Sequence, residues 1–178
     1  VTRAAKEATT TIPIVMGQEP DPVASKVVAS LARPGGNITG MSTITPEIIG
    51  KQLELLKEIN PGLSRVAVIA SSAQSQTART LKDADRAGAA LKIQVQPLDL
   101  KNPQDTEAVL RAASEGRAQA LLVLPSFVIL SQRAQIAEFA IKNRLPSMFP
   151  QIEYVEAGGL MVYGASMTDV YRRAAIYV

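Results

Sequence analysis

The sequence contains no histidine, no cysteine and no tryptophan, and aromatic residues make up only 4% of its 178 residues. The commonest general base, the thiol nucleophile and most zinc and iron ligand sets are therefore missing. Carboxylate or lysine chemistry remains open, but few of the usual catalytic residues are present. We expect a protein that is not an enzyme and that holds a ligand without catalytic residues, a metal or a cofactor.

Strong charge and long apolar runs are also lacking. The net charge is +3, and the lysines and arginines are scattered rather than gathered with aromatic residues in one stripe. This pattern argues against a nucleic-acid partner. No apolar run approaches 18 residues, so we expect no membrane insertion of this segment. The length suits one domain or slightly more, with a sizeable core.

What the sequence does contain is an alternation of short apolar segments with longer segments of helical periodicity. The expected strands are residues 12–16, 38–41, 65–70, 93–98, 120–124, 147–149 and 160–163. The expected helices are residues 1–8, 23–32, 45–60, 74–90, 103–114, 129–143 and 170–178. Such alternation predicts right-handed βαβ units and a parallel sheet covered on both faces. The fold class is therefore α/β, a flavodoxin-like doubly wound parallel sheet, with one complete lobe from residue 65 to about 163.

The most informative segment is the apolar run 65–70, which stops in the polar sequence Ser71-Ser72-Ala73-Gln74-Ser75 before a long helical pattern. Unpaired N–H groups at a helix N-terminus, with the positive end of the helix dipole behind them, favour an anion such as a carboxylate or phosphate. This turn contains no charged residue, no cysteine and no histidine. We predict that it binds a ligand carboxylate; the alternative is that its serines only cap the next helix.

Ligands of doubly wound sheets bind beyond the carboxyl ends of the strands, which adds further candidates. Phe127 and Tyr163 follow two of these strands and either stack on a ligand ring or pack within the lobe. Asp21 precedes Pro22 and either caps a helix or contacts the ligand. Asp99, Pro150 and Gln151 also follow strands. The predicted ligand-binding residues are Asp21, Ser71, Ser72, Gln74, Ser75, Ser126, Phe127, Tyr163 and Ser166.

Several segments resemble a known family, most specifically the string Ala-Arg-Pro-Gly-Gly-Asn-Ile-Thr-Gly at residues 32–40. The other matching segments are residues 12–15, 21–23, 53–59, 144–146, 156–160 and 163–164. Together they resemble the ABC-transporter substrate-binding proteins that include tryptophan- and tyrosine-binding members. The resemblance runs along essentially the whole sequence.

This resemblance implies the periplasmic-binding protein type I fold, in which two flavodoxin-like lobes close on a small ligand. Residues 1–42 would be a remnant of the first lobe, residues 43–163 the second lobe, and residues 164–178 a crossover helix that returns to the first. Both ends of the sequence show helical patterns without cap or stop signals, so we expect a piece of a longer chain.

The resemblance also implies a function. The protein would be the periplasmic or membrane-anchored extracytoplasmic component of an ABC importer, passing a small carboxylate-bearing solute, such as an aromatic amino acid, to a membrane permease. Family members usually carry an acidic residue where this sequence has Ser126, and Asp21 is the alternative source of that charge. A ligand-sensing domain of a regulator or receptor is the second reading. A flavodoxin-like enzyme or receiver domain is the third, although a receiver needs acidic residues where the first strand here ends in Ser-Ser.

Overall fold

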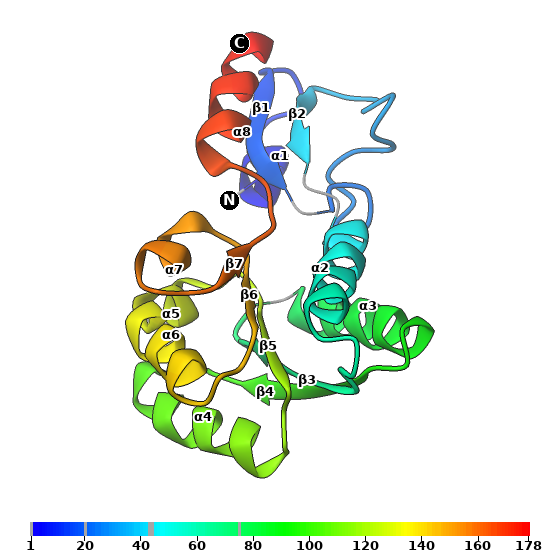
Figure 1. The fold of residues 1–178 in the computed structure, drawn as a ribbon. Helices are drawn as coiled ribbons and strands as arrows, with labels where there is room; N and C mark the ends of the chain where they lie inside the picture. Colours follow the sequence, from blue (N-terminus) through cyan, green and yellow to red (C-terminus); the bar gives the residue numbers. More distant parts are fainter. Residues whose placement is uncertain (1, 20, 43–44, 75) are drawn as a thin grey trace. The chain divides into compact units, whose positions relative to one another are not determined.

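The computed structural model describes residues 2–19, 21–42, 45–74 and 76–178. The chain divides into two compact units (Figure 1). Unit 1 comprises Val1–Thr45 and Ala165–Val178, and unit 2 comprises Pro46–Gly164. Unit 1 is therefore assembled from two separate stretches of the chain, whereas unit 2 is continuous.

Unit 2 is built on a five-stranded sheet in the order β4-β3-β5-β6-β7, and every neighbouring pair is parallel. The strands are β3 (Arg65–Ala70), β4 (Gln94–Asp99), β5 (Ala120–Val123), β6 (Ser147–Phe149) and β7 (Met161–Val162). Numbered along the unit, this order is 2-1-3-4-5, the arrangement of flavodoxin-like sheets. The predicted α/β doubly wound fold is therefore confirmed.

Helices cover both faces of this sheet (Figure 1). One face carries α2 (Thr45–Ile59) and α3 (Thr77–Ala90), and the other carries α4 (Thr106–Glu115), α5 (Phe127–Ser131), α6 (Arg133–Lys142) and α7 (Ile152–Glu156). Because successive side chains of a strand point to opposite faces, β3 contributes to two cores. Val66 and Val68 join the first core, and Ala67 and Ile69 join the second. A strand that is buried on both faces consists of apolar residues, and the apolar residues 66–70 therefore indicated a buried strand in the sequence.

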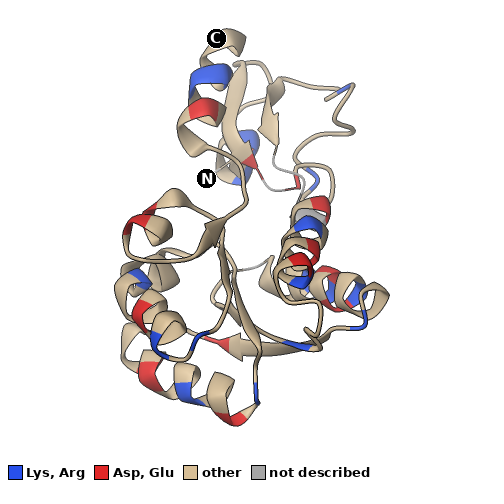
Figure 2. Cartoon of the chain, viewed as in Figure 1, with Lys and Arg blue, Asp and Glu red and all other residues tan. Residues whose placement is uncertain are grey.

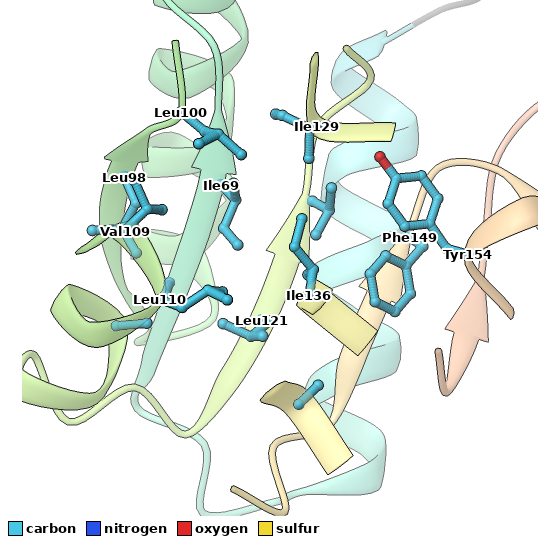
Figure 3. Packing of buried hydrophobic residues seen from close by; sticks show 14 residues of the cluster. Ile69, Leu98, Leu100, Val109, Leu110, Leu121, Ile129, Ile136, Phe149 and Tyr154 are labelled. Atoms are coloured by element: carbon cyan, nitrogen blue, oxygen red, sulfur yellow. The ribbon is translucent and has the colours of Figure 1, made fainter. Parts of the chain in front are cut away.

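The second core contains the largest buried side chains of the unit (Figure 3). Phe149 at the end of β6 stacks on Tyr154 of α7 with ring centroids 4.8 Å apart. Ile129 and Ile136, from α5 and α6, belong to the same cluster and are fully buried. Two aromatic rings thus fix α7 against the end of β6.

Unit 1 contains α1 (Thr2–Ala8), a parallel pair formed by β1 (Ile14–Glu19) and β2 (Ile38–Ser42), and α8 (Met167–Ala174), which continues into the 3-10 turn η2 (Ala175–Tyr177). Helix α8 packs against β1. Gly17 makes room for this contact, because a Cβ at that position would lie 2.8 Å from Cε1 of Tyr171. A glycine in the strand thus allows an aromatic ring of the last helix to lie on it.

The predicted helix 23–32 is wrong. Its first turn forms, since the Asp21 carbonyl accepts the Ser25 N–H at 3.0 Å. Lys26 then adopts a positive φ of 57°, and the Val27 N–H bonds back to the Pro22 carbonyl at 2.8 Å. A left-handed residue with such a bond ends a helix, so turns and bends occupy residues 22–29.

Other predicted segments differ in detail. The predicted helix 129–143 is split into α5 and α6 at Gln132, whose φ of −101° and ψ of 12° are not helical. The predicted loop 150–159 contains the short helix α7. The helix expected from residue 74 begins only at Thr77. Among the described residues, no helix is long and apolar enough to span a bilayer.

Candidate ligand-binding site

The carboxyl ends of β3 and β5 form the topological switch point of the unit 2 sheet. The two strands are neighbours, and the chain leaves β3 toward β4 on one side but leaves β5 toward β6 on the other. The Leu124 N–H donates to the Ile69 carbonyl at 2.9 Å and so ties the two strand ends together. Ligands of doubly wound sheets bind at this point. The structure places Ser71 and Ser72 directly after β3, and Ser126 and Phe127 shortly after β5.

Ser71 is the buried anchor of the segment Ser71–Gln74, here called the β3 loop. Its side chain is 2% exposed, and its Oγ has no hydrogen-bond partner among the described residues. The Ser71 carbonyl accepts two bonds, from the Gln74 N–H at 3.1 Å and from Oγ1 of Thr77 at 2.6 Å. One of these bonds comes from the loop's own backbone and the other from the first residue of α3, and together they fix the position of the Ser71 carbonyl.

The sequence pattern predicted unpaired backbone N–H groups in the β3 loop, but two of these groups already have partners in the structure. The Ser72 N–H donates to Oδ1 of Asp99 at 2.8 Å, and the Gln74 N–H is taken by Ser71. The residue that caps α3 is Gln76, and its own side chain makes no cap bond. The alternative that Ser71 or Ser72 caps α3 is therefore wrong. Ser72 is exposed and Gln74 half-buried, so their side chains remain the accessible polar groups.

Asp99 is the functional candidate that sequence reasoning noted only as a strand end. It is the last residue of β4 and pairs in register with Ala70 of β3, which brings its carboxylate to the β3 loop. Burial, the largest single influence, raises the pKa of Asp99. Hydrogen bonds from the Ser72 N–H and hydroxyl, together with the Lys101 ammonium, outweigh burial and hold that pKa below its ordinary value. Asp99 is therefore ionised at neutral pH.

Phe127 presents an aromatic ring to solvent at the switch point. It is the first residue of α5 and is 90% exposed, so the alternative that it packs within the lobe is wrong for unit 2 as described. Ser126 before it is extended and half-buried, and its side chain makes no cap bond to α5. An exposed ring after one strand and accessible polar side chains after the neighbouring strand suit an aromatic solute with a polar head.

Tyr163 lies elsewhere on the same edge. It follows β7, which is separated from β3 by β5 and β6, so about 14 Å of sheet lies between them at a strand spacing of about 4.8 Å. Its carbonyl accepts a bond of 2.6 Å from Nε2 of the buried Gln52. The structure does not bring Tyr163 into contact with the β3 loop.

Asp21 and Ser166 belong to unit 1 and make local bonds there. Oδ1 of Asp21 accepts the Ala24 N–H at 2.9 Å in the manner of a cap, but the segment that follows is a turn and not the predicted helix. Oγ of Ser166 accepts the Asp169 N–H at 3.3 Å and caps α8. Ser75 lies outside the described residues.

Charged side chains are spread over both units (Figure 2). Helices α2, α3, α4 and α6 carry both signs, and ion pairs such as Glu138–Lys142 run along single helices. Within the described part of the chain, no group of three or more acidic side chains is placed to hold a metal ion.

Comparison with known proteins adds the family. The family model described as ABC transporter substrate binding protein matches residues 1–178. A tyrosine-binding protein of Clostridioides difficile (strain R20291) is 29% identical in an alignment 175 positions long, and the alignment covers 91% of this chain and 46% of that protein.

Two solved structures share the fold. A conserved domain protein from Vibrio cholerae O1 biovar eltor superposes with a TM-score of 0.85 and 25% identity, over 99% of this chain and 58% of that one. The ABC domain from Streptococcus pneumonia in complex with L-Trp superposes with a TM-score of 0.82 and 20% identity, over 99% of this chain and 60% of that one. The chain thus spans about half to three fifths of the length of these three proteins.

These likenesses agree with the five-stranded order 2-1-3-4-5 of unit 2 and identify the periplasmic-binding protein type I fold, present here in part. The match to the family model extends from the first residue to the last. The chain belongs to the ABC transporter substrate binding protein family.

Proposed function

We propose that this chain is part of the extracytoplasmic solute-binding component of an ABC importer, and that it binds a small carboxylate-bearing solute such as an aromatic amino acid. The observation that carries the proposal is the β3 loop, an uncharged polar segment at the switch point of the sheet, where the neighbouring strand β5 is followed by the exposed Phe127. The protein would work in the periplasm or anchored to the outer face of the membrane. It would release its solute to the membrane permease of the importer.

The chemistry of the site fits such a solute. The Gln74 amide can donate hydrogen bonds to a carboxylate, and the Ser72 hydroxyl, which bonds to Asp99 in this structure, can do so by rotating toward the ligand. Bonds to a charged group are each worth about 1.5–3 kcal/mol. Helix α3, 14 residues long, begins just beyond the loop and directs the positive end of its dipole toward it. Phe127 can stack on an aromatic ring. The names of two relatives, a tyrosine-binding protein and a domain in complex with L-Trp, support an aromatic amino acid.

Capture would involve two lobes. We propose residues 1–42 as a part of the first lobe, residues 43–163 as the second, and residues 164–178 as the helix that returns to the first. Because the chain spans less than two thirds of its relatives, the rest of the first lobe would come from residues outside this sequence. Asp21, Ser166 and Tyr163 remain proposed contacts of the closed state, in which hinge motion excludes water from the ligand.

A ligand screen on the full-length protein that contains this sequence tests the proposal. Thermal unfolding is followed with aromatic amino acids, their deaminated carboxylic acids, benzoate and neutral sugars. A ligand at about 100 times its Kd stabilises the folded state by about 2.7 kcal/mol and raises Tm accordingly. We expect the carboxylate-bearing aromatic solutes to raise Tm. A clear preference for neutral sugars would contradict the proposal.

A further inference from the structure

Asp99 is the one acidic side chain at the carboxyl edge of the unit 2 sheet, counting the last residue of each strand and the three described residues after it. The one basic side chain in the same set is Lys101. The proposed ligand-binding serines at this edge, Ser71, Ser72 and Ser126, are uncharged. The fixed charge at this edge is therefore one carboxylate and its lysine neighbour.

The Asp99 carboxylate is hydrogen-bonded to the β3 loop. Oδ1 of Asp99 accepts the Ser72 N–H at 2.8 Å, and the Ser72 hydroxyl also bonds to this carboxylate, so Asp99 lies directly against the β3 loop that is proposed to hold the ligand carboxylate. The Asp99 side chain is still 44% exposed. Oδ2 lies 3.5 Å from Nζ of Lys101, whose side chain is 60% exposed. Ion pairs this exposed are weak in water, so Lys101 does not cancel the negative charge at the loop.

This geometry has a consequence for the charge of the ligand. An anion held at the β3 loop approaches a fixed negative charge, and the repulsion opposes its binding. An α-amino acid carries an ammonium group two bonds from its carboxyl carbon, and that positive charge offsets the repulsion. Because Ser126 is neutral, no carboxylate after β5 provides the same discrimination.

We propose that Asp99 is the specificity-determining residue that makes the β3 loop select zwitterionic amino acids over simple carboxylates. This inference rests on the proposed function, since it assumes that the β3 loop holds the ligand carboxylate. The residues that directly follow β3 and β5 are uncharged and cannot attract the ligand ammonium. In this proposal Asp99, at the end of the edge strand β4, does so instead.

The test compares two ligands that differ only in the ammonium group. Calorimetry on the full-length protein measures Kd for L-tyrosine and for 3-(4-hydroxyphenyl)propanoate. Wild-type protein should prefer L-tyrosine by about tenfold or more, which corresponds to about 1.4 kcal/mol. Asp99→Asn keeps Oδ1 as an acceptor for the Ser72 N–H and removes the charge. It should reduce the preference to within about threefold, by weaker binding of L-tyrosine, tighter binding of the propanoate, or both.

Three controls separate charge from structure. Glu107→Gln removes an exposed charge on α4 that pairs with Arg111, and it should leave the preference unchanged. Lys101→Met should increase the preference, because it removes the cation that opposes Asp99. Raising the salt concentration should decrease the preference of the wild-type protein, because exposed charges are screened.

Asp99→Ala removes both the acceptor and the charge. If Asp99→Ala weakens both ligands equally while Asp99→Asn changes neither, the residue only positions the loop and the inference is overturned. An unchanged tyrosine preference in Asp99→Asn overturns it as well, while the proposed function stands. Wild-type protein that binds neither ligand contradicts the proposed function itself and the inference with it.

Discussion

At the scale of single residues, the structure changes what the serines of the β3 loop can do. Neither Ser71 nor Ser72 caps α3, because the cap position is Gln76. The loop is instead held by backbone groups, by Thr77 and by Asp99. The Ser72 and Gln74 side chains are therefore not needed to cap the helix. The Ser72 hydroxyl bonds to Asp99 and would have to turn from it to bind a ligand carboxylate.

The double variant Ser72→Ala/Gln74→Ala tests this reading in the full-length protein. Loss of bonds to a charged group should weaken binding of L-tyrosine by at least about tenfold, since each such bond is worth about 1.5–3 kcal/mol. The free energy of unfolding without ligand should change by less than about 1 kcal/mol, because exposed polar side chains away from caps have small effects. The double variant Gln104→Ala/Ser114→Ala, at exposed positions near α4, serves as the control and should alter neither quantity. Unchanged affinity together with a clear loss of stability would favour a purely structural loop.

At the scale of elements, strands were the easiest feature to predict. The runs that became β3 and β5 are buried on both faces, so burial requires an unbroken apolar segment that is visible in the sequence. The region 23–32 was mispredicted because its end depends on Lys26, a residue type that gives no sign of a positive φ. Helix α7 was missed because five residues are too few for a periodic pattern.

The candidate site was predicted only in part for a related reason. Ser71, Ser72 and Phe127 follow strands, and position after a strand is readable from the sequence. The bond between Ser72 and Asp99 depends on β4 lying next to β3 in register, which is a property of the assembled sheet. Sequence spacing alone does not contain that pairing.

Two glycines of unit 2 allow a matched test of the packing. Gly50 lies within α2 with no atom in the space that a Cβ would occupy, whereas a Cβ at Gly159 would lie 2.5 Å from Cε2 of Phe149 and 2.7 Å from the Tyr154 carbonyl oxygen. Gly50→Ala should stabilise the protein by about 0.5–1 kcal/mol, because alanine is the better helix former. Gly159→Ala should destabilise it by about 1–3 kcal/mol, because the stacked pair must shift. Denaturant unfolding of both variants gives the two values. A Gly159→Ala variant as stable as wild type would show that the contact between α7 and β6 gives way easily.

At the scale of the whole molecule, the units differ in completeness. Unit 2 has five strands covered on both faces, whereas unit 1 has a two-stranded sheet and several exposed apolar side chains. The unit 1 residues of this kind include Ile12, Leu31, Tyr171 and Ile176. This contrast fits a chain that spans only part of the length of its relatives.

The isolated 178-residue chain should therefore bind L-tyrosine much more weakly than the full-length protein. Ligand pockets bury most of the surface of their ligand, and one wall alone cannot do so. Calorimetry on both forms, side by side, gives the comparison. Equal and tight affinity of the two forms would contradict the two-lobe proposal. Circular dichroism provides the control, since the isolated chain must retain its α/β spectrum for the comparison to hold.

The placement of Tyr171 over Gly17 has a consequence for the order in which the chain folds. One partner of this contact lies in β1 and the other in α8, with all of unit 2 between them in the sequence. Synthesis proceeds from the N-terminus, so the first stretch of unit 1 leaves the ribosome long before the helix that covers it. Unit 2 is continuous and can complete its sheet during that interval. The face of β1 at Gly17 therefore stays without its Tyr171 cover until the last helix has been synthesised.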